Sequence, residues 1–185
     1  YQVGIMSLQL AQQHRLDMDI CNNACTVADI LIGMNKLDEA ETCLKESLPW
    51  HMRGSSVAHV FVLERMARLR LTKNDLQGAI LNLKELKRIN PKSENADVEM
   101  GRLYLALNDT TSALNAFDNA IENEPSKPVA YGIRAFIRMV RNDEKGALED
   151  YSKAIEKGSE FVGDYINRGI LNVKRVFAAG GRRRR

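Results

Sequence analysis

Histidine and cysteine are the side chains here whose spacing could indicate a metal site or a disulfide. His51 and His59 flank an irregular stretch, but no further ligands follow them at a recognised metal-site spacing. Cys21 and Cys25 are one helical turn apart, and Cys43 is expected on the paired helix. Three cysteines do not form a disulfide framework, so we expect small buried thiols in a reducing compartment. The sequence therefore predicts no metal site, and it favours a cytoplasmic location.

The motifs of common enzymes are also missing. The chain has no Gly-x-Gly-x-x-Gly fingerprint, no phosphate loop, no His-Glu-x-x-His pair and no nucleophile elbow. Most Asp and Glu residues fall at expected turns or on the wet faces of expected helices, where a charge usually only keeps the surface solvated. We therefore predict that the chain is not an enzyme and uses no cofactor.

The charge distribution and hydropathy exclude further classes of protein. The formal net charge is +3, and the tail from Arg182 to Arg185 supplies four positive charges. The rest is near neutral, which argues against a general nucleic-acid binder. No apolar run reaches the roughly 18 residues that a membrane span needs. The start, Tyr1-Gln2-Val3-Gly4, lacks methionine and any signal-peptide pattern, which is typical of a piece of a longer protein.

A 34-residue repeat organises the chain. The dipeptide Asn-Asp recurs at this step, followed in phase by an alanine, a bulky residue, a small or apolar residue and a proline. The in-phase sets are Asn74, Asn108 and Asn142; Ala79, Ala113 and Ala147; Leu83, Phe117 and Tyr151; Leu86, Ala120 and Ala154; and Pro91 and Pro125, with Ser159 replacing the next proline. A fixed period of this size indicates a stack of supersecondary units and not a single globular core.

The copy from Ser93 to Lys127 shows how one unit forms. Apolar residues first follow a helical period, and Asn108-Asp109-Thr110 then breaks it. The carboxylate of Asp109 can accept the free N–H groups at the start of the next helix. A second apolar stripe runs as far as Pro125, which ends the helix because proline has no N–H to donate. The pattern predicts two antiparallel helices joined by a short turn.

Small residues in each unit predict close helix packing. Gly101 on the first helix and Ala113 on the second would let the two backbones approach, and Ala120 would admit the next unit. Phe117 would fill the space between hairpins. One hairpin cannot bury this much apolar surface alone, so neighbouring hairpins must stack.

This pattern resembles the tetratricopeptide repeat family. The residues that carry the resemblance are Met100, Gly101, Tyr104, Ala113, Phe117, Ala120 and Pro125, then Tyr131, Ala135, Ala147, Tyr151 and Ala154. The chain departs from the family at Asp97, where tryptophan is usual, and at Arg134 and Arg138, where leucine and tyrosine are usual. The resemblance implies an all-α fold, a right-handed α-solenoid of stacked antiparallel helix hairpins.

The repeat phase predicts the boundaries of the array. From Ala40 to Ala79 the step is 39 residues, so the extra residues must lie near Trp50 to Ser56. Trp50 there could anchor a partner or pack under the loop, and we expect packing. Pro49 is expected to end the helix before it. A single array over 1–177 follows, with a partial repeat helix at 1–19, repeats at 20–54, 57–93, 94–127 and 128–161, a terminal or capping helix at 162–177, and a disordered basic tail or expression scar at 178–185.

The resemblance also implies where a ligand would bind. In tetratricopeptide arrays the first helices line a concave groove that commonly holds a peptide. The groove residues expected from the phase are Arg65, Arg68, Asn95, Arg102, Ile133, Phe136, Val140, Ile166, Asn167 and Ile170. Arginines give positive charge in the middle, tempered by Glu64 and Glu99, and the far end is apolar. Some members bind the C-terminal carboxylate of chaperones through a lysine and an asparagine. Cys25 and Asp29 stand at the analogous positions here, so this carboxylate-binding pattern is absent.

Two functions remain open. The chain is either a protein–protein interaction scaffold or adaptor that holds a peptide or helical segment in its groove, or a self-association module that oligomerises through its terminal helices. The groove favours an acidic amphipathic segment, because arginine forks pair with carboxylates while apolar side chains enter the far end. The apolar strip could equally be covered by further helices of the parent protein.

Overall fold

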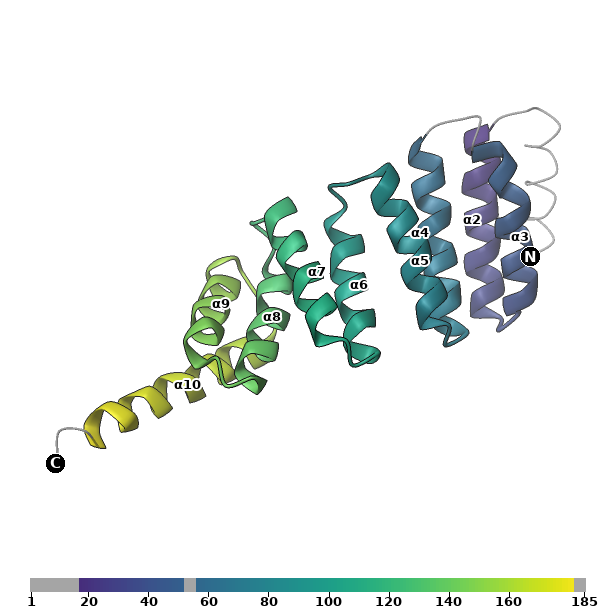
Figure 1. Cartoon of the computed structure of the whole chain (residues 1–185). Coiled ribbons are helices and arrows are strands. Elements are labelled where there is room, and N and C mark those ends of the chain that lie inside the picture. Colours follow the sequence, from purple (N-terminus) through teal and green to yellow (C-terminus); the bar gives the residue numbers. More distant parts are fainter. Residues whose placement is uncertain (1–16, 52–55, 182–185) are drawn as a thin grey trace. The chain divides into compact units, whose positions relative to one another are not determined.

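The structure, a computed structural model, describes residues 17–51 and 56–181, and every regular element among them is an α-helix (Figure 1). The helices are α2 (Asp17–Gly33), α3 (Leu37–His51), α4 (Ser56–Thr72), α5 (Leu76–Ile89), α6 (Glu94–Ala106), α7 (Thr110–Asn123), α8 (Pro128–Val140), α9 (Glu144–Glu156) and α10 (Val162–Gly181). The predicted all-α fold of helix hairpins is confirmed. None of the described helices is both long and apolar enough to cross a membrane.

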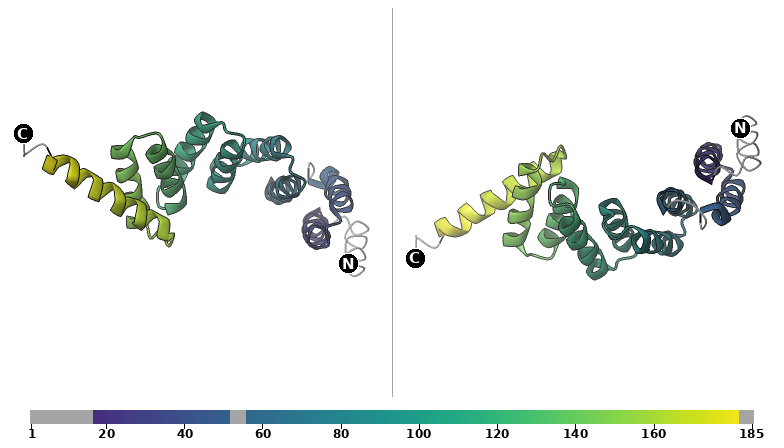
Figure 2. Two further views of the ribbon diagram at one scale, coloured as in Figure 1. Left: turned by 90° about the horizontal axis from the view of Figure 1, so that it is seen from below. Right: turned by 90° about the horizontal axis from the view of Figure 1, so that it is seen from above.

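The chain forms two compact units, residues 1–96 and residues 97–185. In the first, α2 pairs with α3 and α4 with α5, and α4 also packs on both helices of the preceding hairpin. In the second, α7 packs on α8, α8 pairs with α9, and α10 packs on α9 (Figure 2). Neighbouring hairpins within each unit therefore stack, as one hairpin alone could not bury its apolar faces.

An asparagine in the left-handed conformation ends the first helix of each hairpin. Asn35, Asn74, Asn108 and Asn142 have φ of 59°, 59°, 60° and 62°. Asparagine tolerates this region better than most residues because its short amide forms local hydrogen bonds. The next residue closes the helix end, as in Asp109, whose N–H donates to the carbonyl of Tyr104 at 2.8 Å.

The aspartate after this asparagine caps the second helix in three hairpins. The side chains of Asp75, Asp109 and Asp143 accept hydrogen bonds from the backbone N–H groups of Gly78, Ser112 and Gly146. These bonds satisfy donors that the first turn of a helix leaves unpaired. The recurring Asn-Asp dipeptide is thus a complete stop-and-start signal, which confirms the cap expected at Asp109.

Small residues let the helices approach as predicted. Phe117 is fully buried, and a Cβ placed on Gly101 would lie 2.6 Å from its Cζ atom, so glycine is needed there. Ala113 and Ala120 are also fully buried and belong to the same cluster as Phe117. Tyr151 takes the equivalent place in the next repeat and is fully buried.

The arginines that depart from the family pattern form an ionic network around the buried carboxylate of Asp150. Nε and Nη2 of Arg134 lie 2.8 and 2.7 Å from the two carboxylate oxygens of Asp150, and Nη1 lies 2.5 Å from Asp118. Nη1 of Arg138 lies 2.8 Å from Asp150 as well. The side chain of Asp150 is only 2% exposed, so two guanidinium groups neutralise a charge that burial would otherwise penalise. This network joins α7, α8 and α9.

Asp97, at the place of the usual tryptophan, is also buried. It accepts a hydrogen bond of 2.8 Å from Nδ2 of Asn123 on α7. A polar link between α6 and α7 therefore replaces the apolar contact that the family residue would make.

Some helix bounds differ from those predicted. The helix α3 does not end at Pro49 but continues to His51, because a proline so near the C-terminal end removes only one late hydrogen bond. Helix α2 begins at Asp17, before the start of the repeat expected at 20–54, and α10 extends to Gly181, beyond the end expected at 177. Residues 1–16, the larger part of the partial helix expected at 1–19, lie outside the described residues. So do the stretch 52–55, the side chain of Trp50 and residues 182–185.

Candidate functional site

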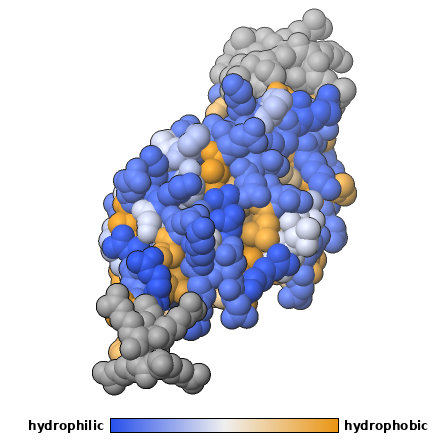
Figure 3. All heavy atoms as spheres, turned by 60° about the vertical axis from the view of Figure 1, so that its left-hand side comes forward, coloured by the Kyte–Doolittle hydropathy of each residue, from blue (hydrophilic) through white to orange (hydrophobic). Residues whose placement is uncertain are grey.

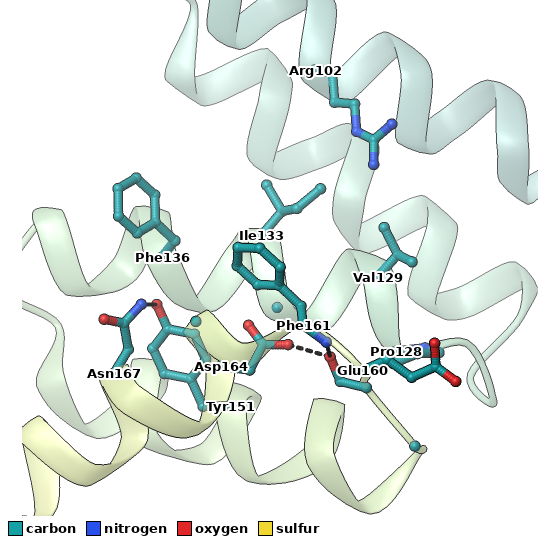
Figure 4. A pocket seen from close by; sticks show the side chains of 14 residues that line it. Arg102, Pro128, Val129, Ile133, Phe136, Tyr151, Glu160, Phe161, Asp164 and Asn167 are labelled. Atoms are coloured by element: carbon teal, nitrogen blue, oxygen red, sulfur yellow. Dashed lines mark hydrogen bonds between the residues drawn. The ribbon is translucent and has the colours of Figure 1, made fainter.

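A hollow of about 770 Å³ opens on the surface of the second unit. Its lining comes mainly from one face of α8, the turn between α9 and α10, and the first turns of α10, with Tyr151 of α9 at its floor (Figure 4). Arg102 of α6 stands at its rim. Figure 3 draws one face of the molecule, on which apolar patches lie among mostly polar and charged side chains.

The wall from α8 is apolar because its residues follow a helical spacing. Val129, Ile133 and Phe136 are four and three residues apart, which places them on one face. Val129 is 44% and Phe136 52% exposed, so this wall has no cover from the described chain. Water in contact with such a wall is released when an apolar ligand binds, which favours association.

The base of the hollow is polar but internally satisfied. Asp164 is 4% exposed and accepts a hydrogen bond of 2.5 Å from Oγ of Ser159. Gly132 makes room for this carboxylate, since a Cβ there would lie 2.8 Å from Asp164 Oδ2. Nδ2 of Asn167 donates to the hydroxyl of Tyr151 at 2.9 Å. These groups form the floor and are hydrogen-bonded to one another, so a charged group of a ligand would be recognised at the rim, by Arg102.

Burial raises the pKa of the Tyr151 phenol above its ordinary value, an effect that the hydrogen bond from Asn167 opposes. The phenol therefore stays protonated at neutral pH. Its oxygen accepts from Asn167, so the floor carries no charge at this point.

Arg102 is the basic residue in the lining. Its side chain is 51% exposed, and Nη1 lies 2.8 Å from Oε1 of Glu99, one turn earlier on the same helix. Exposed pairs of this kind contribute about 0–1 kcal/mol, so a ligand carboxylate can replace Glu99 at little cost. A guanidinium also offers a planar fork that suits a carboxylate.

The first unit has a smaller and more polar hollow of about 290 Å³. Its lining is Asn22, Cys25, Thr26, Asp29, Phe61 and Arg65. Arg65 and Arg68 each lie 3.5 Å from a carboxylate oxygen of Asp29, so both are engaged with an acid of the chain itself. Burial raises the pKa of the Cys25 thiol to about 11, which leaves it protonated and unreactive.

The structure brings together four of the ten predicted groove residues. Arg102, Ile133, Phe136 and Asn167 line the larger hollow, and Arg65 lines the smaller one. The remaining residues lie outside both linings, and each is exposed: Arg68, Asn95, Val140, Ile166 and Ile170.

Sequence reasoning missed the residues of the α9–α10 turn. Ser159, Glu160 and Phe161 line the hollow, but the repeat phase places groove residues only on first helices. The one available signal was Ser159 itself, which stands where earlier repeats have proline and so marks a different turn.

No protein-family model matches the chain. Among curated proteins, DnaJ homolog subfamily C member 3 of Bos taurus is 34% identical over 84 residues, which is 43% of this chain and 17% of the relative. The same protein of Homo sapiens is 33% identical over an equal length. The matched region therefore spans less than a fifth of these curated relatives.

Solved structures agree on the architecture. A tetratricopeptide repeat protein from Parabacteroides merdae superposes with a TM-score of 0.72 at 18% identity, covering 84% of this chain and 60% of its own. The chain has the tetratricopeptide-repeat fold. The MamA protein has a TM-score of 0.68 at 18% identity, with 82% and 80% of the two chains covered. The first such domain of RPAP3, solved with an HSP90 peptide, has a TM-score of 0.57 at 15% identity, with 64% and 94% covered.

Proposed function

We propose that this chain is a non-enzymatic protein-interaction scaffold that binds a segment of a partner protein in the hollow of residues 97–185. The observation that carries this proposal is the exposed apolar wall of α8 facing a basic rim residue across a hollow of about 770 Å³. A hollow of this size accommodates several side chains of a peptide.

The chemistry of the lining favours an acidic amphipathic segment. Apolar side chains of the segment would pack on Ile133 and Phe136, and one carboxylate would pair with Arg102. Arg65 and Arg68 are weaker candidates for this pairing because neither lines the larger hollow, whose wall is apolar. The RPAP3 domain, which shares the fold, was solved with a peptide, and this likeness supports a peptide as the class of ligand.

A selection from random peptides displayed on phage, followed by affinity measurements, tests the proposal. Arg102→Glu and Phe136→Asp should each lower the affinity for the selected peptides at least about tenfold, as expected when a central contact of an interface is lost. Leu81→Asp is the control, because Leu81 is 65% exposed but lies on α5, away from both hollows. Equal affinities for all three variants and the unaltered chain would exclude the hollow as the binding site.

A second candidate function is self-association through α10. Ile166, Ile170 and Val173 are each 56% exposed and Phe177 is 76% exposed, at spacings of four, three and four residues. This spacing forms an apolar stripe that suits packing against another helix. Sedimentation velocity over a range of concentrations should show a dimer or larger species that Ile170→Asp with Val173→Asp abolishes. A monomer at every concentration would reject this second function.

A further inference from the structure

An exposed aromatic ring forms part of the hollow without belonging to any helix face. Phe161 lies in the turn between α9 and α10 and is 71% exposed. Its ring lies beside Ile133 in Figure 4, with Arg102 on one side and Glu160 on another. The exposed ring keeps apolar surface in contact with water, and a ligand side chain that packs on it would release that water.

The turn that carries Phe161 is held by hydrogen bonds at several points. Oγ of Ser159 donates to Asp164 at 2.5 Å and accepts from the backbone N–H of Phe161 at 3.3 Å. The hydroxyl of Tyr165 donates to the carbonyl oxygen of Ser159 at 2.9 Å. The carbonyl of Phe161 accepts from the N–H of Asp164 at 3.0 Å. The backbone under the ring is therefore fixed before any ligand binds.

Glycine at position 163 permits this position of the ring. A Cβ on Gly163 would lie 2.4 Å from Cε1 and 3.0 Å from Cζ of Phe161. The ring thus packs directly over a residue without a side chain. Gly169, six residues later on the same helix, has no atom within 4 Å of an added Cβ. The two glycines offer a matched pair for an experiment.

We propose that Phe161 is the specificity-determining wall of the hollow and selects an aromatic side chain in the bound segment. The ligand ring would pack against Phe161 and the exposed part of the α8 wall, and an acidic residue next to it would pair with Arg102. Glu160, on another side of the Phe161 ring, disfavours a second acid there and favours a neutral or basic residue. This inference rests on the proposed function, and it names the chemistry of the partner: a segment with an aromatic residue beside an acid.

Two glycine variants test the inference with little change to the core. Gly163→Ala should displace the Phe161 ring, a movable side-chain end, while Gly169→Ala should change nothing. The probes are the peptides selected on the unaltered chain and copies in which their aromatic residue is replaced by leucine. The unaltered chain and Gly169→Ala should prefer the aromatic peptides about fivefold or more. Gly163→Ala and Phe161→Ala should lose this preference and bind about tenfold more weakly.

The outcomes separate this inference from the function on which it rests. Suppose that Arg102→Glu lowers the affinity for the selected peptides but Gly163→Ala and Phe161→Ala bind them as the unaltered chain does. Phe161 then does not determine specificity, and this inference fails while the proposed function stands. If Arg102→Glu and Phe136→Asp also leave the peptide affinity unchanged, both proposals are rejected. Urea unfolding of each variant verifies the fold. If Gly163→Ala is unstable, the peptide affinity of Phe161→Ala alone tests the role of the ring.

Discussion

At the scale of single residues, the network around Asp150 shows how two arginines can occupy places that usually hold apolar side chains. Arg134 reaches Asp150 with two nitrogens and Arg138 with one, inside a packed repeat. A buried carboxylate is tolerable only when it is paired and hydrogen-bonded. The arginines and the acid therefore depend on each other, and removing the carboxylate of Asp150 would leave Arg134 and Arg138 without their buried partner.

Asp150→Ala should destabilise the second unit by about 3 kcal/mol, because it leaves two cations without their buried partner. Urea unfolding followed by circular dichroism measures the loss. Asp118→Ala is the control, since Asp118 pairs with the same Arg134 but its side chain is 54% exposed, and the expected cost is below about 1 kcal/mol. Equal losses for the two variants would contradict the importance assigned to the buried pair.

Sequence alone identified Arg134 and Arg138 as departures from the family pattern but not their common partner. Asp150 lies on the following helix, 16 and 12 residues from the two arginines. Only the packing of α8 on α9 shows that all three side chains meet. The sequence shows that these three residues are charged, whereas their pairing depends on the tertiary structure.

At the scale of elements, the hairpins were predictable because their signals are local. Asn-Asp stops one helix and starts the next through bonds that span few residues, as at Asn142 and Asp143. The end of α3 was less predictable, because Pro49 predicts a stop although a proline so near the C-terminal end removes only one late hydrogen bond. Local chemistry fixes the existence of helices better than their last residues.

Ion pairs also connect elements of the first unit and make it sensitive to acid. The Glu41 carboxylate on α3 accepts from Lys45 and from Lys73, which follows α4. These two hydrogen bonds lower the pKa of Glu41 from 4.5 to about 2. Because the folded pKa is the lower one, the stabilisation is present above pH 4.5 and is lost as the pH falls towards 2.

Glu41→Gln should therefore reduce the pH dependence of stability in this range. The free energy of unfolding of the unaltered chain should fall between pH 4.5 and 2, and that of the variant should fall less, because the amide has no proton to gain. Urea titrations at several pH values provide both curves. Parallel curves for the two proteins would show that Glu41 carries no linked proton.

The hollow was predictable in part for the same reason of locality. The spacing of Ile133 and Phe136 on α8 places them on one face from sequence alone. Phe161 could not be found in this way, because its place depends on a turn that Ser159 and Asp164 build and on the missing side chain at Gly163. A repeat phase describes helices, and this wall of the site is not helical.

At the scale of the whole molecule, the 34-residue period predicted the fold but left the partner open. Repeats specify how hairpins stack, and the same stack can present many different surfaces. The predicted groove residues fall in both compact units, with Arg65 lining one hollow and Arg102 the other. Of these two hollows, the larger one, in residues 97–185, combines an apolar wall with an exposed basic side chain, whereas the lining of the smaller one is mostly polar.

The most direct test of the central claim is an NMR titration of the isotope-labelled chain with a peptide selected on it. Binding in the larger hollow predicts that backbone amide shifts change at Val129, Gly132, Ile133, Phe136 and Phe161, and that they stay constant along α5. Shifts confined to α2 and α4 would place the ligand in the smaller hollow. Either that result or changes spread along the exposed stripe of α10 would contradict the proposed site.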